Sequence, residues 1–364
     1  MSLYRTYRPV SFADIAGQEH IKQTLQNEIA GDSLVHAYIF SGPRAVGKTT
    51  TARVLTRAIN CLNRKAGTSE PCNECDACVA IRDNRTLDVI EIDAASNRGI
   101  DMVRDNIISA ARVGRAGLAW KVFIIDEVHM MTTEAFNALL KVLEEPPSFV
   151  MFILATTELH KVPATVVSRC QRFDFKKIAP DAMRVRLERI CILEGKKVEQ
   201  SVLDSIIRLS SGYLRDAESL LGQVLSLDEK NIDVKKAAIV LPLGSLELVK
   251  KFIASLIAKD AKGALHALDS AIDGGIDLGV LCADILEFLR TLLLIKAGAQ
   301  DLVAESENEI QERETLCAPL SEGDILSILE YLLAAQRDMR YSSLPQLPLE
   351  IALAKMCGVI QPSS

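Results

Sequence analysis

The sequence predicts an α/β fold with a doubly wound parallel sheet, followed by helical domains. Three observations lead to this expectation. An apolar run, residues 38–40, is followed by a glycine-containing loop and then by helical periodicity. A second apolar run, residues 120–125, ends in two adjacent carboxylates. Strands and helices alternate from about residue 37 to 175, whereas only helical periodicity continues from about residue 179. Ligands of such sheets bind at the carboxyl ends of the strands.

The loop after the first strand matches the phosphate-binding pattern G-x-x-x-x-G-K-[ST]. Backbone N–H groups of such a loop converge on phosphates, and the following helix presents its positive end. Lys48 supplies a mobile charge, and Thr49 would hold Mg²⁺. We therefore expect a bound nucleoside triphosphate, held by Gly42, Pro43, Arg44, Ala45, Val46, Gly47, Lys48, Thr49 and Thr50.

The two carboxylates after residue 125 match the Walker B arrangement. Asp126 can coordinate Mg²⁺ directly or through water, and Glu127 can orient and deprotonate the attacking water. This predicts hydrolysis as well as binding. His129 extends the motif to D-E-x-H, a pattern that also occurs in helicases, and is expected to be a packing or polar-contact residue.

Two further strands are expected, at residues 87–92 and 149–157. After the first, Ser96 or Asn97 is expected to cap a helix that begins near Ile100. Arg98 would then be free to contact a phosphate backbone, although a capped surface loop explains these residues equally well. Thr157, at the end of the second strand, can sense a γ-phosphate or orient water.

Four of the nine cysteines are concentrated between residues 61 and 78. Cys72, Cys75 and Cys78 form a tight C-x-x-C-x-x-C loop, which Cys61 can complete from the end of the preceding helix. This spacing predicts a closed, structural Zn²⁺ site. An iron–sulfur cluster, a redox pair or unrelated free thiols are the alternatives.

Composition agrees with a folded chain of two or three domains. The 364 residues are 49% hydrophobic and 25% charged, which allows substantial cores. Residues 1–14 lack the apolar stretch of a secretion signal, and no apolar segment is long and uncharged enough to cross a membrane. We therefore expect a cytoplasmic protein without a membrane partner. The net charge of −6 restricts any DNA contact to a local patch.

Several motifs together resemble one family, the gamma/tau subunits of bacterial DNA polymerase III. The subunits of this family are AAA+ P-loop ATPases of the sliding-clamp loader. The resemblance covers essentially the whole chain and is most specific in the cysteine insertion and the Ser-Arg-Cys motif. It is carried by residues 7–9, 12–15, 17–19, 42–49, the four cysteines, 126–130, 137–141, 143–147 and 168–170.

The resemblance implies a domain order and residue roles. An AAA+ core would span residues 1–178 with a zinc module at 61–78, a helical lid 179–241, and a helical oligomerising collar 242–364. Thr157 occupies the sensor-1 position, Arg169 matches the arginine finger that acts on a neighbouring subunit, and Arg215 matches the sensor-2 arginine. The adenine would lie near Tyr7, Arg8 and Pro9 and near residues 15–18, and template-strand phosphates near Asn97, Arg98 and Gly99.

The function that the resemblance implies is ATP-driven clamp loading. ATP binding would close the assembly, open the sliding clamp and grip primer–template DNA, and DNA-triggered hydrolysis would release the clamp on DNA. The implied partners are other gamma/tau copies and the delta and delta-prime subunits of a hetero-pentamer, the clamp and DNA, at the nucleoid. The chain ends at Ser364, so it resembles the short gamma form or a fragment of that length.

Ala45 departs from the family pattern, in which a glycine is expected. A methyl group is tolerated there if φ stays negative and distorts the loop if φ must be positive. We expect a competent loop.

Two other functions are compatible with parts of the pattern. A DNA-translocating motor such as a branch-migration helicase shares the core but does not require the cysteine module or a collar. A scaffold subunit would keep Ser-Arg-Cys without hydrolysis, and the intact Lys48, Thr49, Asp126 and Glu127 argue against it.

Overall fold

The computed structural model describes residues 2–65, 67–227, 229–241, 245–274, 276–299, 303 and 307–358. The chain forms two compact units, Met1–Val234 and Lys235–Ser364. The three ranges expected from the sequence, 1–178, 179–241 and 242–364, stay predictions. Residues 242–244, where the collar was expected to begin, lie outside the described residues.

The first unit contains a five-stranded parallel sheet, which confirms the predicted α/β class. The strand order is β2-β3-β4-β1-β5. The chain thus adds strands on one side of β1 and then crosses to its other side for β5. The three central strands, β3, β4 and β1, are almost entirely buried because parallel strands are covered on both faces. The strands are β1 (Ala37–Ser41), β2 (Val89–Asp93), β3 (Lys121–Asp126), β4 (Val150–Thr156) and β5 (Gln171–Asp174).

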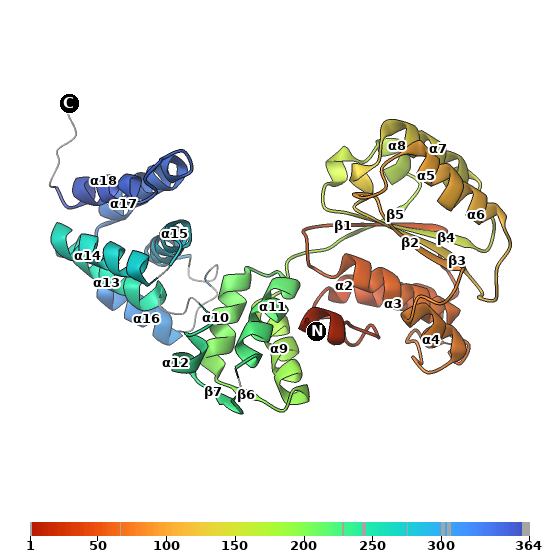
Figure 1. Ribbon diagram of the computed structural model, residues 1–364, viewed down its shortest axis with the longest axis horizontal. Coiled ribbons are helices and arrows are strands. Elements are labelled where there is room, and N and C mark those ends of the chain that lie inside the picture. The colour runs from red at the N-terminus through yellow and green to blue at the C-terminus, as the bar shows by residue number, and fades with distance from the viewer. Residues whose placement is uncertain are drawn as a thin grey trace. The chain divides into compact units, whose positions relative to one another are not determined.

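Helices cover both faces of this sheet (Figure 1). Alternate residues of β1 point to opposite faces: Tyr38 and Phe40 pack with the α2 and α3 side chains, whereas Ala37 and Ile39 pack with those of α7. One face carries α2 (Glu19–Ala30) and α3 (Lys48–Asn60), and the other carries α5 (Ile100–Met102), α6 (Ser109–Arg112), α7 (Thr133–Glu144) and α8 (Ala164–Val167). Residues Val103–Ile108 form a π-helical turn between α5 and α6.

Helical structure follows the sheet, as the periodicity predicts. Pro180 occupies the first turn of α9, where its missing N–H is not needed. Arg186 of α9 and Glu218 of α11 form a buried ion pair, with Nε 2.9 Å from Oε1. The elements are α9 (Pro180–Leu193), α10 (Gln200–Ser210), α11 (Leu214–Leu225) and α12 (Val234–Ala237), with a short parallel pair β6 (Lys197–Val198) and β7 (Asn231–Ile232).

Two short helices lie outside this order. Helix α1 (Leu3–Thr6) packs against α11 near Gly222. Helix α4 (Asp76–Arg82) belongs to the cysteine segment and packs against α3.

The second unit is helical throughout its described elements. Asp277 caps α15 by accepting from the Val280 N–H, and Ser321 with Asp324 forms a capping box on α17. Its core joins apolar side chains from most of its helices, for example Phe252, Leu289 and Leu332. The helices are α13 (Ser245–Ile257), α14 (Ala261–Asp273), α15 (Leu278–Lys296), α16 (Glu307–Leu316), α17 (Glu322–Met339) and α18 (Leu347–Met356).

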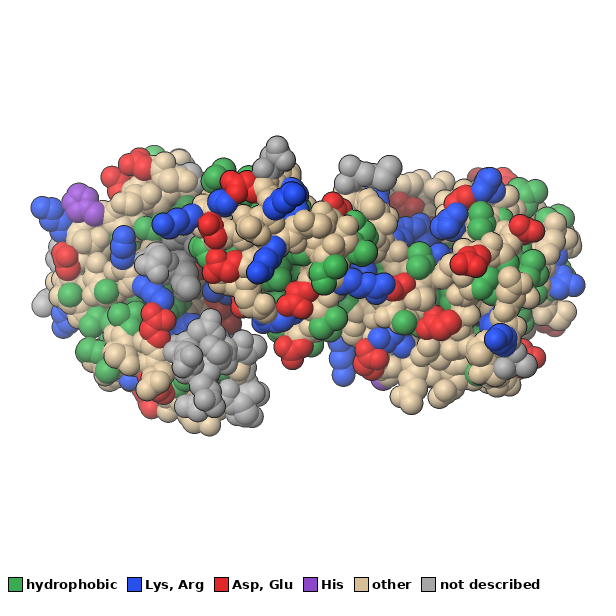
Figure 2. Space-filling model, turned by 90° about the horizontal axis from the view of Figure 1, so that it is seen from below, with side chains coloured by type: hydrophobic (Ala, Val, Ile, Leu, Met, Phe, Trp, Pro, Cys, Tyr) green, Lys and Arg blue, Asp and Glu red, His purple; other side chains and the backbone are tan. Residues whose placement is uncertain are grey.

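The surface is mixed in charge. On the face seen in Figure 2, acidic and basic side chains are interspersed. Among the described residues, no helix combines the length and the apolar composition needed to cross a lipid bilayer.

Candidate nucleotide-binding site

The loop between β1 and α3 places its lysine where phosphates would bind. Lys48 is the first residue of α3, and its side chain is buried. Its Nζ donates to the carbonyls of Gly42 at 2.8 Å and Pro43 at 2.7 Å. Burial lowers the pKa of Lys48, while the carboxylates of Glu127 and Asp126 raise it. A phosphate would replace weak carbonyl acceptors with a charged one, which favours the protonated ammonium.

Ala45 adopts the left-handed backbone conformation, with φ of +60°. We expected an undistorted loop on the condition that φ of Ala45 is negative. The observed φ is positive, so that condition is wrong. A Cβ in this region costs about 1–2 kcal/mol because it approaches the following carbonyl oxygen. Gly47, at φ of +103°, meets the same backbone demand without that cost. The loop therefore holds its shape against local strain at one position.

We expect Ala45→Gly to raise the free energy of unfolding by about 0.5 kcal/mol, because relief of strain exceeds the added chain entropy of glycine. Urea unfolding of the full chain measures this. Ala80→Gly, in helix α4, is the matched control and should lower stability, since its backbone is helical. A loss of stability in both variants would contradict the strain at Ala45.

The two acids after β3 lie at the carboxyl edge of the sheet. The Thr49 hydroxyl donates to Asp126 Oδ2 at 2.7 Å, and the Glu127 N–H donates to Asp126 Oδ1 at 2.9 Å. Burial raises the pKa of Asp126, and the Thr49 hydrogen bond lowers it. Glu127 itself has φ of 48° and ψ of 44°, a strained conformation for a non-glycine residue.

At the end of β4, the Thr157 hydroxyl contacts Glu127 and the Thr156 hydroxyl contacts His129. Thr157 Oγ1 donates to Glu127 Oε2 at 3.0 Å. The Thr156 hydroxyl lies 3.0 Å from His129 Nδ1, and His129 Nε2 lies 3.3 Å from Glu158 Oε1. His129 is nearly buried and makes polar contacts, as expected from the sequence. The hydrogen bond from Thr157 helps to orient the Glu127 carboxylate.

A cavity of about 1050 Å³ joins these parts. It is large enough for a nucleoside triphosphate, since ligand pockets span about 300–1,000 Å³. It receives residues from five places: the N-terminal segment, the phosphate loop, the acidic edge, Ile178 after β5, and the start of α11. Among the predicted site residues it is lined by Arg8, Pro9, Pro43, Arg44, Ala45, Val46, Gly47, Lys48, Thr49, Thr50, Asp126, Glu127, Thr157 and Arg215.

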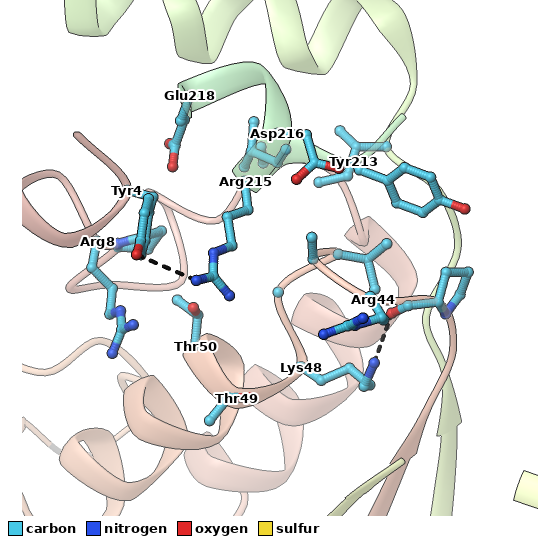
Figure 3. Close-up of a pocket in the computed structure, with 18 of the residues that line it drawn as sticks. Tyr4, Arg8, Arg44, Lys48, Thr49, Thr50, Tyr213, Arg215, Asp216 and Glu218 are labelled. Atoms are coloured by element: carbon cyan, nitrogen blue, oxygen red, sulfur yellow. Dashed lines mark hydrogen bonds between the residues drawn. The ribbon is translucent and has the colours of Figure 1, made fainter. Parts of the chain in front are cut away.

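Arg215 reaches into this cavity from α11 (Figure 3). Its guanidinium lies 4.4 Å from the ring centroid of Tyr4, and Nη2 donates to the Tyr4 hydroxyl at 3.3 Å. Sequence reasoning missed Tyr4, because a tyrosine near the N-terminus matches no phosphate motif. Tyr4 holds the arginine over the cavity by a cation–π contact.

Tyr7 does not line the cavity. Its hydroxyl donates to Glu194 Oε1 at 2.8 Å, and its carbonyl accepts from Arg186. Of the predicted adenine segment 15–18, Ile15 and Ala16 line the cavity. Gly42 contributes its carbonyl to Lys48, and an added Cβ there would lie 2.3 Å from the Phe175 carbonyl oxygen.

Arg169 lies away from this cavity. Its Nη2 is 2.7 Å from Glu144 Oε1, and Nη1 donates to the Thr165 carbonyl at 2.7 Å. About a third of its side chain is exposed. The structure therefore does not bring Arg169 to the nucleotide cavity of its own chain.

The loop proposed for DNA contact is exposed between β2 and α5. Asn97 Nδ2 donates to the Asp93 carbonyl at 3.3 Å, and Arg98 Nε donates to the Ala95 carbonyl at 2.9 Å. The expected cap at Ser96 or Asn97 is wrong: Gly99 is the N-cap residue of α5 and offers no side chain. Asn97 donates its side-chain hydrogen bond to Asp93 within the loop, so it does not cap the start of α5.

The four cysteines expected to bind a metal converge. Their Sγ atoms all lie within 4.8 Å of one another. The Cys72 N–H donates to Cys61 Sγ at 3.3 Å, and the Cys75 N–H donates to Cys72 Sγ at 3.3 Å. Burial raises the pKa of the Cys61 thiol, and the Cys72 N–H lowers it; the thiolate is the form that binds metals. Four convergent thiols fit a tetrahedral site.

Two family models of DNA polymerase III subunits match the chain. The model described as "DNA polymerase III, delta subunit" matches residues 17–179, and that described as "DNA polymerase III subunits gamma and tau domain III" matches residues 232–363. Among solved structures, the chain resembles the Thermotoga maritima RuvB Holliday junction branch migration motor with a TM-score of 0.49. That match has 17% identity and covers 74% of this chain and 86% of that chain.

Curated relatives match almost the whole chain. The DNA polymerase III subunit tau of Bacillus subtilis (strain 168) is 40% identical over 358 residues, which cover 98% of this chain and 63% of the relative. The gamma/tau subunit of Mycobacterium tuberculosis (strain H37Rv) is 37% identical over 363 residues, or 98% of this chain and 62% of the relative. The chain thus spans less than two thirds of the length of these relatives. Taken with the two matching family models, these identities show that the chain belongs to the family of DNA polymerase III gamma and tau subunits.

Proposed function

We propose that this chain is the ATP-hydrolysing AAA+ subunit of a sliding-clamp loader. The observation that carries the proposal is the cavity in which Lys48, Asp126 and Glu127 meet an arginine from a separate helical element. Such a cavity can bind a triphosphate, activate water and pass the outcome to the helices. Family membership supports placing this ATPase in the DNA polymerase III assembly.

Each residue of the cavity has a task that follows from its position. Lys48 leaves the Gly42 and Pro43 carbonyls and neutralises phosphate charge. Thr49 and Asp126, already joined by a hydrogen bond, would hold Mg²⁺, which supplies Lewis-acid stabilisation of the phosphates when bound. Glu127 orients and deprotonates water, and Thr157 holds its carboxylate in place.

Arg215 and Arg169 would act at two different ATP sites. Arg215 contacts the nucleotide of its own chain and ties it to α11. Arg169 is partly exposed and does not line that cavity, and it would serve the site of a neighbouring subunit. Each ATP site is then complete only in the assembly, with other gamma/tau copies and the delta and delta-prime subunits as neighbours. The helices from α13 onward would form the oligomerising collar.

ATP works as a timed switch in this proposal. Binding closes the subunits, opens the clamp and grips primer–template DNA, with Asn97, Arg98 and Gly99 at template phosphates. Hydrolysis breaks the contacts between subunits and releases the closed clamp. The four cysteines would hold Zn²⁺ as a structural ion, since a closed tetrahedral site leaves no position for substrate. The setting would be the cytoplasm, at the nucleoid.

ATP turnover of the chain assembled with delta and delta-prime partners tests the proposal, with and without clamp plus primed DNA. Strong stimulation by clamp and DNA together is the expected result. ATP turnover that is stimulated by DNA but not by the clamp would support a translocating motor instead. No turnover in any mixture would support a scaffold subunit.

A further inference from the structure

Glu70 connects the cysteine segment to the N-terminal segment of the chain. It lies in the loop between Cys61 and Cys72 and is half-buried. One carboxylate oxygen accepts from the Phe12 N–H at 2.8 Å. The other accepts from the Ala13 N–H at 3.1 Å and from Gln26 Nε2 at 3.1 Å. A single carboxylate therefore joins three parts of the chain that are distant in sequence.

The segment that Glu70 holds is a wall of the nucleotide cavity. Phe12 and Ala13 form a turn in which the Ile15 N–H donates to the Phe12 carbonyl at 3.1 Å. Arg8 and Pro9 line the cavity before this turn, and Ile15 lines it after the turn. A displacement of the turn would therefore move both stretches of the wall.

Other contacts of the same segment come from the core. Arg57 donates to the Pro9 carbonyl at 3.2 Å, and Lys22 Nζ donates to the Ile15 carbonyl at 3.1 Å. These donors hold the two sides of the turn, whereas Glu70 takes its two backbone N–H groups. Hydrogen bonds to an ionised carboxylate are about twice as strong as neutral ones. The Phe12 side chain is buried in the core and Asp14 is paired with Arg189, and Glu70 adds the hydrogen bonds to the Phe12 and Ala13 N–H groups.

The loop that carries Glu70 is anchored at both ends. Cys61 and Cys72 belong to the convergent thiol cluster, with the Cys72 N–H bonded to Cys61 Sγ. Arg64 donates to the carbonyls of Ile29 and Thr68, which ties the middle of the loop to the end of α2. The described residues of the loop are therefore tied to the cysteine cluster at Cys72 and to α2 through Arg64.

We propose that the cysteine segment positions the wall of the nucleotide cavity through Glu70, which acts as a positioning residue for ATP. This inference rests on the proposed nucleotide site and gives the cysteine segment a task within it. The segment makes no catalytic contact; it fixes the turn at Phe12 and Ala13 so that Arg8, Pro9 and Ile15 meet the nucleotide in place.

Amide hydrogen exchange and nucleotide affinity of the full chain test this proposal. In Glu70→Ala, the amides of residues 10–15 should exchange about tenfold faster, and the Kd of a fluorescent ATP analogue should rise about tenfold. Glu70→Gln keeps the side-chain size and one acceptor oxygen, so its effects should be intermediate. Glu74→Ala is the matched control, because Glu74 is exposed in the same segment, and it should change neither quantity.

Wild-type exchange and wild-type affinity in Glu70→Ala would overturn the proposal, as would equal effects from Glu74→Ala. If Glu70→Ala does not fold, the comparison of Glu70→Gln with Glu74→Gln decides by the same two measurements. A wild-type chain that binds no ATP would refute the proposed function, yet the exchange rates at Phe12 and Ala13 would still show whether Glu70 holds the turn.

Discussion

Replacing Glu127 with glutamine is expected to reduce ATP turnover by about 10²–10⁴-fold while ATP binding persists. Glutamine retains an oxygen that can accept from Thr157, so the side chain keeps its place but loses its basicity. Lys48 and Thr49 are untouched, so the phosphate site remains. Single-turnover hydrolysis in the assembled complex, together with equilibrium binding of ATP to the chain, measures the two effects separately.

Glu134→Gln provides the control for this variant. Glu134 is an exposed acid in the first turn of α7, outside the cavity, so its neutralisation should leave turnover unchanged. Turnover of Glu127→Gln within a few-fold of wild type would show that another group activates water, and the assignment of Glu127 would fail.

Replacing Arg169 with alanine should lower turnover of the assembly by about 10³-fold or more, which is the usual scale for an arginine finger. ATP affinity of the isolated chain should stay the same, because Arg169 lies outside the cavity of its own chain. Arg172→Ala removes another exposed arginine, paired with Asp174, and should leave turnover near wild type.

A mixed assembly makes the prediction for Arg169 sharper. Chains carrying Arg169→Ala supply an intact Glu127, and chains carrying Glu127→Gln supply an intact Arg169. If the finger acts between subunits, mixing the two inactive chains should restore part of the turnover. Absence of any recovery, with weaker ATP binding by the isolated Arg169→Ala chain, would place the arginine within its own site.

Much of the core could be predicted because buried parallel strands are near-continuous apolar runs. The strands around β1, β3 and β4 begin or end within one or two residues of the expected positions. Phosphate-loop and acidic residues also follow from local pattern, since their chemistry requires adjacent residues in sequence. The convergence of the cysteines could likewise be predicted, because the C-x-x-C-x-x-C spacing brings thiols together.

Features that depend on contacts between residues far apart in the sequence could not be predicted from local sequence patterns. Strands β6 and β7 contain two residues each, too few for alternation to be seen. Tyr4 reaches the cavity only because α1 packs against α11, which no motif indicates. The π-helical turn at Val103–Ile108 looks like ordinary helix in sequence, and the positive φ of Ala45 contradicts the usual preference of alanine.

Helix α7 connects two features that were described separately above. At its start, the Thr132 N–H donates to the carbonyl of Arg98 at 3.1 Å, and at its end Glu144 is paired with Arg169. Its 12 residues form a rod of about 18 Å. If Arg169 acts on a neighbouring subunit as proposed, one helix would link that neighbour to the exposed loop at Arg98.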